Sequence, residues 1–210
     1  MKYKVMIVED QTMPRELFEL RVQSSEHFEV ALSIDSAALT DVYCLRFPVD
    51  LILMDVVTRG GESGLDAAER IKRTFPQIKI IIVTSMPECS YLSRAREIGV
   101  ESFWYKEEQR ESLLDVMERT MAGESVYPDA TPEMQLGLAS SYKFTDRELE
   151  VLREMTGGDT NQEIAERLHM SVATVKTHIL NMLEKTGFRN RTELAVRARE
   201  SGLVILNRKN

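Results

Sequence analysis

The feature that most constrains the fold of this chain is the apolar run Leu51-Ile52-Leu53-Met54, which stops at Asp55. Four consecutive apolar residues are typical of a strand buried on both faces, as in a parallel sheet. An acid directly after such a strand lies at the carboxyl edge of the sheet, where open α/β folds bind their ligands. Taken alone, the pattern favours an ordinary strand followed by a turn-forming aspartate, so the rest of the chain must decide between the two interpretations.

Four further apolar runs alternate with helical patterns over the first part of the chain. Together with Leu51–Met54, strands are expected at Tyr3–Val8, Phe28–Ile34, Lys79–Thr84 and Ser102–Tyr105. Helices are expected at 15–24, 37–47, 64–75, 91–98 and 111–121, the second of them with Leu39, Val42, Tyr43 and Leu45 facing inward. Alternating strands and helices predict an α/β domain with a five-stranded, doubly wound parallel sheet, because parallel neighbours need crossover helices.

The composition changes after residue 122. Pro128, Pro132, Gly137 and the Ser140-Ser141 pair break the periodicity, so residues 123–143 are expected to form a linker, with a short helix at 133–139 as an option. The predicted organisation is therefore a first domain at 1–122, a linker at 123–143 and a second domain at 144–210.

The second domain has an all-helical pattern with four helix starts. Thr145 with Glu148, and Thr160 with Glu163, have the spacing of a capping box. Ser171 can cap a third helix at 172–186, and a fourth is expected at 191–200. A helix at 161–168, a short turn and a longer helix form helix-turn-helix spacing, although plain helical bundles share it.

Charge and composition narrow the functional classes. Residues 142–210 hold 12 Lys and Arg against 10 Asp and Glu, whereas residues 1–141 hold 15 against 24. This contrast favours an acidic site in the first domain and a polyanion partner for the second. Two isolated cysteines, Cys44 and Cys89, and the lack of an apolar run of about 20 residues favour a cytoplasmic protein without membrane contact.

Polar residues follow four of the expected strands, at the edge where ligands bind. Glu9 and Asp10 follow the first strand, Asp55 the third, Thr84 ends the fourth and Lys106 follows the fifth. Two carboxylates about 4 Å apart repel by about 4 kcal/mol at an effective dielectric constant near 20, and Mg²⁺ is a hard, oxygen-liganded cation that removes this cost. An aspartate beside Mg²⁺, a lysine and a threonine hydroxyl is equipped to accept a phosphoryl group.

These residues resemble the receiver domains of two-component response regulators. The matching segments are Glu9-Asp10, Leu53-Met54-Asp55, Val83-Thr84-Ser85 and Phe103-Trp104-Tyr105-Lys106. The resemblance implies a flavodoxin-like fold and phosphorylation of Asp55 by a sensor histidine kinase. It further implies that Glu9, Asp10, Asp55 and the Val57 carbonyl bind Mg²⁺. Lys106 and Thr84 would assist the transfer, and Thr84 and Phe103 would act as switch residues. The chain departs from the family in a looser, more polar loop at 57–62 and in Glu107-Glu108 after Lys106, which bear on kinase fit and acyl-phosphate lifetime.

The third helix of the second domain is the candidate DNA reader. Val175, Ile179 and Met182 share its inward face, which His178 borders. The outward face carries small, hydroxyl, basic and amide side chains that suit base edges and phosphates, and the apolar Leu180 suits a thymine methyl group. The candidate DNA-binding residues are Thr174, Val175, Lys176, Thr177, Leu180 and Asn181.

This helix belongs to a longer motif that resembles the LuxR/FixJ-type output domain. The matching residues are Thr145, Arg147-Glu148, Val151-Leu152, Gly158, Asn161–Ala165, Ser171, Thr174–His178 and Asn190–Thr192. The resemblance implies four helices, DNA recognition through the third and dimerisation partly through the fourth. The chain departs from it at Leu180 and at Lys185-Thr186-Gly187.

Together the two resemblances imply a response regulator whose phosphorylation at Asp55 promotes homodimerisation and controls transcription. Double-stranded DNA and a histidine kinase are the expected partners, and RNA polymerase is a further candidate. One alternative is a DNA-binding regulator of the same architecture that acts without phosphorylation. Another is a Mg²⁺-dependent phosphoaspartate hydrolase, which is disfavoured because such enzymes place a second acid two residues after the nucleophile and position 57 is Val. The chain is not expected to be a turnover enzyme, beyond autodephosphorylation of Asp55.

Overall fold

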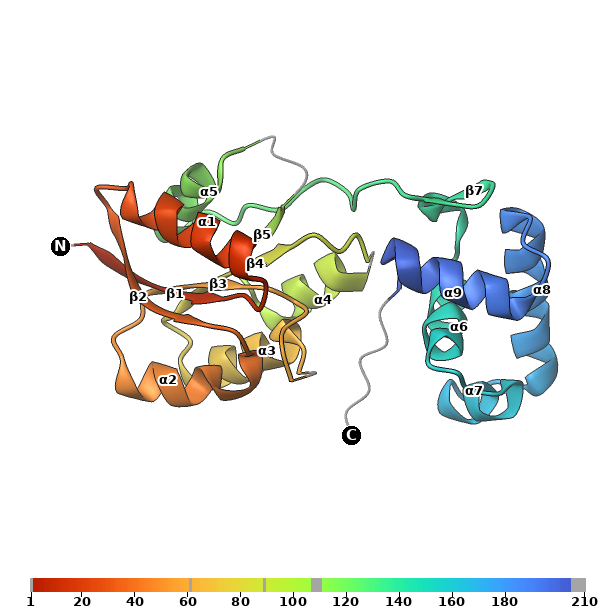
Figure 1. The fold of residues 1–210 in the computed structure, drawn as a ribbon. Helices are drawn as coiled ribbons and strands as arrows, with labels where there is room; N and C mark the ends of the chain where they lie inside the picture. Colours follow the sequence, from red (N-terminus) through yellow and green to blue (C-terminus); the bar gives the residue numbers. More distant parts are fainter. Residues whose placement is uncertain (1, 61, 89, 107–110, 205–210) are drawn as a thin grey trace. The chain divides into compact units, whose positions relative to one another are not determined.

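The computed structural model describes residues 2–60, 62–88, 90–106 and 111–204 (Figure 1). The chain divides into two compact units, and the main boundary lies between Ala130 and Thr131. Cys89 and the Glu107-Glu108 pair, which the sequence singled out, lie outside the described residues.

The first unit is built on a five-stranded parallel sheet, as predicted. Its strands are β1 (Tyr3–Val8), β2 (Phe28–Ile34), β3 (Leu51–Met54), β4 (Lys79–Thr84) and β5 (Ser102–Tyr105), in the order β2-β1-β3-β4-β5 (Figure 1). Val8 pairs with Met54 at the ends of β1 and β3, and Thr84 pairs with Tyr105 at the ends of β4 and β5, which extend two residues past the Met54–Ile82 pair. The residues that follow β1, β3, β4 and β5 therefore emerge at one edge of the sheet.

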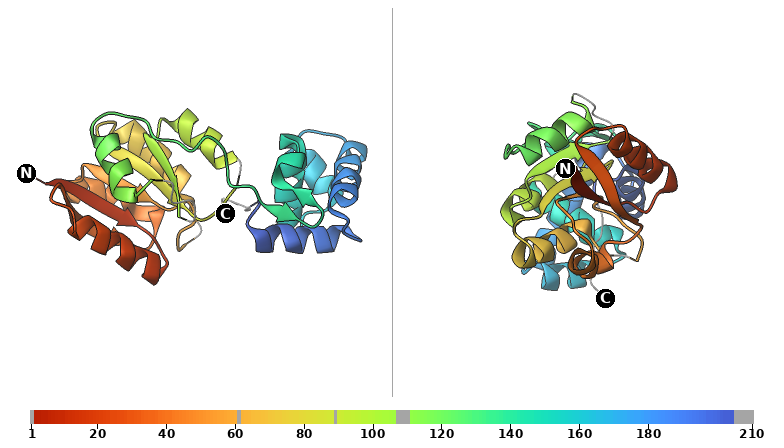
Figure 2. Two further views of the ribbon diagram at one scale, coloured as in Figure 1. Left: turned by 90° about the horizontal axis from the view of Figure 1, so that it is seen from above. Right: turned by 90° about the vertical axis from the view of Figure 1, so that its left-hand side faces the viewer.

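Helices cover both faces of this sheet (Figure 2). On one face, α1 (Thr12–Gln23) and α5 (Leu113–Met121) bury apolar side chains against the strands. On the other face lie α2 (Thr40–Arg46), α3 (Gly64–Thr74) and α4 (Ser90–Ile98). The core of the first face consists of Val5, Ile7, Phe18, Val22, Phe28, Leu51, Leu53, Ile81, Val83, Trp104, Leu113, Val116 and Met117.

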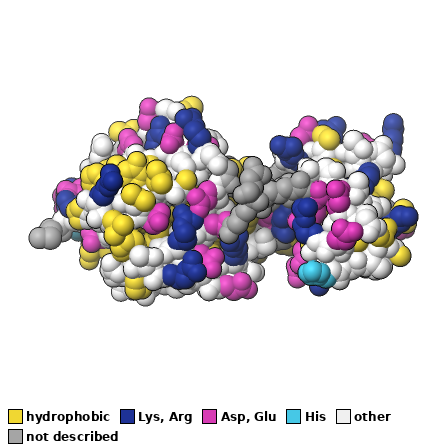
Figure 3. Space-filling model, turned by 90° about the horizontal axis from the view of Figure 1, so that it is seen from below, with side chains coloured by type: hydrophobic (Ala, Val, Ile, Leu, Met, Phe, Trp, Pro, Cys, Tyr) yellow, Lys and Arg dark blue, Asp and Glu magenta, His cyan; other side chains and the backbone are white. Residues whose placement is uncertain are grey.

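The helix expected at 37–47 is broken, and this corrects the prediction of its inward face. A 3-10 turn, η1 (Ala37–Leu39), precedes α2, and the buried residues are Ala37 and Thr40. Leu39 and Leu45 are 56% and 73% exposed, so their prediction as inward residues was wrong. Figure 3 shows hydrophobic side chains gathered on the surface over α2. The change from a 3-10 turn to an α-helix shifts the phase of the apolar positions, which a uniform helical period does not anticipate.

The second unit begins with a small hairpin rather than the short helix considered at 133–139. Strand β6 (Gln135–Leu136) pairs antiparallel with β7 (Ala139–Ser140), and Gly137 adopts a φ of +61° at the turn. The Leu138 N–H donates to the Thr186 carbonyl, and a Cβ on Gly137 would lie 2.2 Å from that oxygen. Only glycine permits this close approach, and the contact with a distant helix end selects the hairpin.

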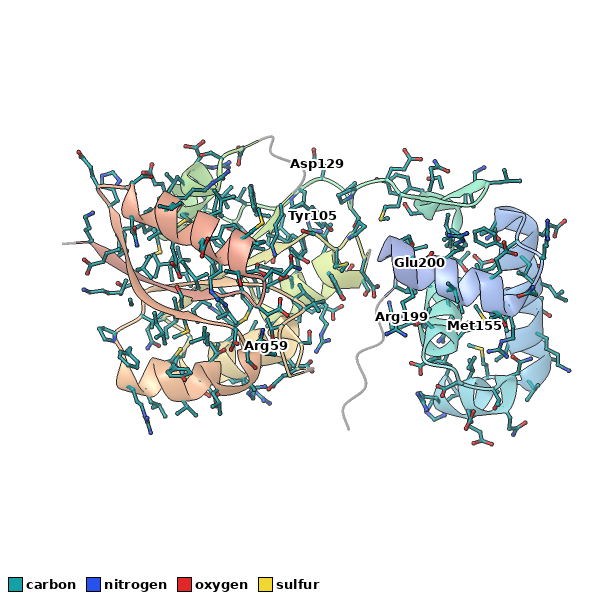
Figure 4. The ribbon with its side chains drawn as sticks, viewed as in Figure 1. Arg59, Tyr105, Asp129, Met155, Arg199 and Glu200 are labelled. Carbon is teal, nitrogen blue, oxygen red and sulfur yellow. The ribbon has the colours of Figure 1, made fainter. Side chains whose placement is uncertain are left out.

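The helical part of the second unit agrees with the predicted four helices. A 3-10 turn, η2 (Ser141–Lys143), leads into α6 (Asp146–Thr156), α7 (Asn161–Arg167), α8 (Val172–Thr186) and α9 (Arg191–Ser201). Both predicted capping boxes are present, at Thr145 with Glu148 and at Thr160 with Glu163. Met155, labelled in Figure 4, is one of the side chains buried among these helices. In the described part of the chain, no helix combines the length and the apolar character needed to cross a membrane.

Candidate functional site

Two carboxylates and one ammonium group meet at the carboxyl edge of the sheet, where β1, β3 and β5 end. The Lys106 Nζ lies 2.5 Å from Glu9 Oε2 and 2.9 Å from Asp55 Oδ2. Glu9 is fully buried and Asp55 is 4% exposed. Three residues that are far apart in the sequence thus form one buried ionic cluster, which confirms their predicted convergence.

Asp10 adds a third carboxylate to this cluster. Glu9, Asp10 and Asp55 each offer an oxygen atom, and these atoms all lie within 4.8 Å of one another. Carboxylates at such separations repel strongly in a buried site, and the one ammonium of Lys106 compensates only part of the negative charge. The remaining negative charge, on hard oxygen donors, is the chemistry that a small divalent cation requires.

Burial sets the protonation behaviour of Asp55. It raises the pKa of Asp55 to about 6, while Lys106 acts in the opposite direction and Glu9 adds to the increase. Burial alone would lower the pKa of Lys106, but Asp55 and Glu9 together raise it above its usual value. Near neutral pH the site therefore holds an ionised, poorly solvated aspartate beside a permanent cation. Such a carboxylate can act as a nucleophile.

The backbone around Asp55 depends on Gly64, a residue that the sequence marked only as a helix start. The Asp55 N–H donates to the Val8 carbonyl, and the Gly64 N–H donates to the Val56 carbonyl at 2.8 Å. A Cβ on Gly64 would lie 1.9 Å from the Asp55 carbonyl oxygen. Gly64 therefore lets α3 begin directly against the chain that carries Asp55. The signal in the sequence that could have revealed this contact was the glycine at position 64, shortly after Asp55.

The loop after Asp55 is better anchored than its polar composition suggested. Val57 forms an isolated antiparallel bridge with Ser63. The Thr58 hydroxyl accepts the Ala37 N–H at 3.0 Å and donates to the Glu62 carbonyl at 3.2 Å. Arg59, labelled in Figure 4, pairs with Asp35 at 2.9 Å. The expected looseness of this loop is not found in its described residues.

The two predicted switch residues lie on the adjacent strands β4 and β5. Thr84 is fully buried at the end of β4, and its carbonyl accepts the Lys106 N–H at 2.9 Å. Phe103, on β5, is 2% exposed, and its ring centroid lies 5.0 Å from that of Tyr105. Trp104 faces the opposite side of the sheet, where it packs against Phe18.

Helix α8 presents most of the predicted DNA-contacting residues to solvent. Thr174, Lys176, Thr177, Leu180 and Asn181 are exposed, and Leu180 reaches 65%. Val175 is fully buried, so its inclusion among the DNA-binding residues was wrong. It lies one turn before Ile179 on the face that packs inward, and side chains on that face are occupied by the core.

A half-buried ion pair joins α8 to α6. Lys185 lies 2.6 Å from Glu148 Oε2, and it also donates to the Lys143 carbonyl. Burial alone would raise the pKa of Glu148, but hydrogen bonds from Lys185 and from Thr145 hold it below its usual range. Thr186, one of the positions at which the chain departs from the LuxR/FixJ-type pattern, is buried and donates its hydroxyl to the Met182 carbonyl. The exposed face of α8 is thus carried by a fixed scaffold.

Comparison with known proteins gives the same division of the chain. Residues 5–118 match the family described as the response regulator receiver domain, and residues 142–198 match that of bacterial regulatory proteins of the luxR family. The chain is 34% identical to the response regulator protein VraR of Staphylococcus epidermidis, over 97% of this chain and 100% of that one. The identity is 32%, with the same coverage, for VraR of Staphylococcus aureus.

Solved structures share the fold over nearly the whole chain. A complex of the two-component response regulator RcsB with DNA has a TM-score of 0.63 at 20% identity, covering 96% of this chain and 99% of that one. RcsB from Salmonella enterica serovar Typhimurium, bound to the promoter rprA with the phosphomimetic BeF₃⁻, has a TM-score of 0.61 at 18% identity, covering 93% and 98%.

The acidic cluster at the sheet edge, the helix-turn-helix unit and these full-length relatives lead to one assignment. The chain belongs to the two-component response regulators, with a receiver domain and a LuxR-type DNA-binding output domain, and it is a regulatory protein rather than a turnover enzyme.

Proposed function

We propose that Asp55 accepts a phosphoryl group from the histidine of a sensor kinase and that this reaction controls DNA binding by α8. The observation that carries the proposal is the contact of Lys106 with both Asp55 and Glu9 inside a buried acidic cluster. In the transfer, an Asp55 carboxylate oxygen forms a bond to phosphorus while the bond from phosphorus to the histidine nitrogen breaks. The Lys106 ammonium and the Thr84 hydroxyl are the groups that would receive the charged phosphoryl oxygens.

Mg²⁺ is the proposed cofactor. The donor set fits it, because Glu9, Asp10 and Asp55 supply three carboxylates within 4.8 Å and the Val57 carbonyl belongs to a loop that a bridge to Ser63 anchors. When bound, the cation supplies positive charge that offsets the charge on the transferring group. The Lys106 ammonium adds a second positive charge beside Asp55, and burial excludes water from the Asp55 carboxylate.

The regulated step is proposed to be homodimerisation on double-stranded DNA. Phosphorylation replaces the single negative charge of ionised Asp55 with about two, and a two-state receiver responds to such a change through Thr84 and Phe103. The second unit carries only a modest basic excess, with 12 Lys and Arg against 10 Asp and Glu in residues 142–210. Two copies of α8 about one DNA turn apart would supply the affinity that one copy lacks. The proposed setting is the bacterial cytoplasm, and RNA polymerase is a further proposed partner.

Phosphodonor-dependent DNA binding tests the proposal directly. Incubation of the full chain with acetyl phosphate and Mg²⁺ should add one hydroxylamine-labile phosphoryl group at Asp55, detected by mass spectrometry. DNA affinity and the dimer fraction should rise together, and Asp55→Asn should abolish both responses. Asp35→Asn is the matched control, since this exposed carboxylate pairs with Arg59 outside the cluster. DNA affinity that is the same with and without the phosphodonor would favour a regulator that acts without phosphorylation.

Mg²⁺ affinity should depend on pH through Asp55. Because the pKa of Asp55 is raised to about 6, protons compete with the cation at moderately low pH. Affinity should be nearly constant above pH 7 and should fall about tenfold per pH unit well below pH 6. Isothermal titration, or the fluorescence of the single tryptophan, Trp104, can measure it. In Asp55→Asn the affinity should be weaker and the inflection near pH 6 should disappear; an unchanged inflection would assign the titration to another group.

Lys176 should contribute to DNA affinity through phosphate rather than base contact. Lys176→Ala should weaken binding to all DNA sequences to a similar degree and should reduce the slope of log affinity against log salt by about one per protomer. Fluorescence anisotropy at several salt concentrations measures this slope. Lys2→Ala, which removes an exposed lysine of the first unit, is the control and should leave the slope unchanged. A sequence-selective loss in Lys176→Ala would instead indicate base readout.

A further inference from the structure

The chain directly after α5 is hydrogen-bonded to the sheet, within the region that the sequence predicted as linker. The Phe103 N–H donates to the Val126 carbonyl at 2.8 Å, and the Ser125 hydroxyl donates to the Glu101 carbonyl at 2.7 Å. The Tyr127 hydroxyl donates to the Val100 carbonyl at 2.8 Å. We call Ser125–Tyr127 the 125–127 segment; it lies along the outer edge of β5 (Figure 1).

A buried chain of hydroxyl groups joins this segment to β5 and α5. The Val126 N–H donates to the Ser102 hydroxyl, which lies 2.7 Å from the Thr120 hydroxyl, and Thr120 donates to the Val116 carbonyl. Ser102 and Thr120 are both fully buried. The Ser102 hydroxyl therefore accepts a hydrogen bond only while the segment stays in place, and an unpaired buried polar group is costly.

Tyr127 covers the switch aromatic. Its ring centroid lies 6.2 Å from that of Phe103, and the Arg96 guanidinium of α4 lies 4.7 Å from the centre of the Tyr127 ring. Burial raises the pKa of the Tyr127 hydroxyl to about 12, so it stays protonated as the donor to Val100. One side chain thus contacts β5, α4 and the turn between them.

We propose that the 125–127 segment is a latch, which transmits the state of Phe103 to the connection between the two domains. The inference rests on the proposed phosphorylation of Asp55. Tyr127 is the residue through which this phosphorylation would act on the output domain. Phe103 is enclosed between Tyr105 and Tyr127, so a change in its rotamer must displace one of them.

The displaced residue is Tyr127. Tyr105 is 2% exposed and lies within strand β5, whereas Tyr127 is half-buried and lies on a segment outside the helices and strands. Displacement of Tyr127 also breaks its contact with Arg96 and weakens the bonds of Val126. The second unit begins at Thr131, four residues after Tyr127, so release of the latch frees the connection next to the output domain.

The test measures coupling in the full-length protein with beryllofluoride and Mg²⁺ as the phosphoryl mimic. Wild type should bind DNA about 5- to 150-fold more tightly with the mimic, the usual range of allosteric coupling. In Tyr127→Ala, affinity without the mimic should rise toward the loaded value, so that this ratio falls close to one. Tyr127→Phe keeps the ring contact, and Tyr43→Ala removes a half-buried tyrosine from α2; both should retain the wild-type ratio.

Hydrogen exchange in the wild type gives a second, independent readout. Addition of beryllofluoride and Mg²⁺ should accelerate exchange of the Phe103 and Val126 amides, because their bonds belong to the latch. Three results would each overturn the latch. The first is a wild-type ratio of DNA affinities, with and without the mimic, in Tyr127→Ala, and the second is loss of this ratio in Tyr127→Phe or Tyr43→Ala. The third is unaltered exchange at the two amides while DNA affinity rises. If the DNA affinity of the wild type is the same with and without the mimic, the proposed function is wrong, and the latch with it.

Discussion

Lys106→Met should lower the free energy of unfolding by about 3–5 kcal/mol in the absence of divalent cations, because it leaves buried carboxylates without their cation. Lys106 is the group that contacts both Glu9 and Asp55, at 2.5 and 2.9 Å. Methionine keeps an unbranched apolar chain of similar length, so the change removes charge more than packing. Urea unfolding at pH 8 measures the loss.

The pH dependence of this loss identifies its cause. In wild type the folded-state pKa of Asp55, about 6, exceeds the ordinary value of 3.8, so its contribution to stability is largest when it is protonated and is lost as pH rises through 6. Without Lys106 the folded pKa rises further, since the cation that opposes the increase is gone. The deficit of Lys106→Met should therefore be smaller at pH 5 than at pH 8.

A matched ion-pair control separates the buried cluster from ordinary surface pairs. Arg59→Met breaks the pair with Asp35, in which the Arg59 side chain is 70% exposed. Pairs of this kind are worth about 0–1 kcal/mol. Mg²⁺ should restore part of the stability of Lys106→Met and none of any loss in Arg59→Met. Equal stability of wild type and Lys106→Met at pH 8 would contradict the ionic cluster.

Gly64→Ala should destabilise the first domain by about 3 kcal/mol, the upper end for overpacking, and should abolish phosphorylation of Asp55. The new Cβ would lie 1.9 Å from the Asp55 carbonyl oxygen and 2.9 Å from Met54 Cγ. A backbone oxygen cannot move aside as a flexible side chain does, so the chain that carries Asp55 must shift. Thermal unfolding and acetyl phosphate labelling measure the two effects.

Gly99→Ala is the control for this prediction. Gly99 has a φ of +84°, and nothing lies within 4 Å of the Cβ that alanine would add. Its cost should be the backbone penalty of a left-handed residue, about 1–2 kcal/mol, with phosphorylation retained. Full labelling of Asp55 in the Gly64→Ala variant would show that the contact does not position the acceptor.

Local sequence patterns predicted the elements well where a local cause produces them. The strand Leu51–Met54 has the predicted bounds, because a run of apolar residues between polar ones needs no distant contact to be recognised. The capping boxes at Thr145 and Thr160 are present for the same reason, since each is made within four residues. The convergence of Glu9, Asp55 and Lys106 was predicted because each follows the carboxyl end of a parallel strand.

Predictions that depended on the phase of a helix or on distant contacts were less accurate. Leu39 and Leu45 are exposed because a 3-10 turn precedes α2, and the 133–139 region forms a hairpin because Gly137 meets the end of α8. Neither cause is visible in the local pattern. The exposed Leu180 was anticipated, whereas Val175 entered the DNA-binding set although its own periodicity placed it inward.

The sequence by itself determined the order of strands and helices, the helix caps and the residues that gather at the sheet edge, because these follow from periodicity, capping and topology. The tertiary structure alone decided the raised pKa of Asp55, the need for glycine at position 64 and the attachment of Tyr127 over Phe103. Each of these depends on distances of a few ångströms between residues remote in sequence, and electrostatic and packing energies change steeply over such distances.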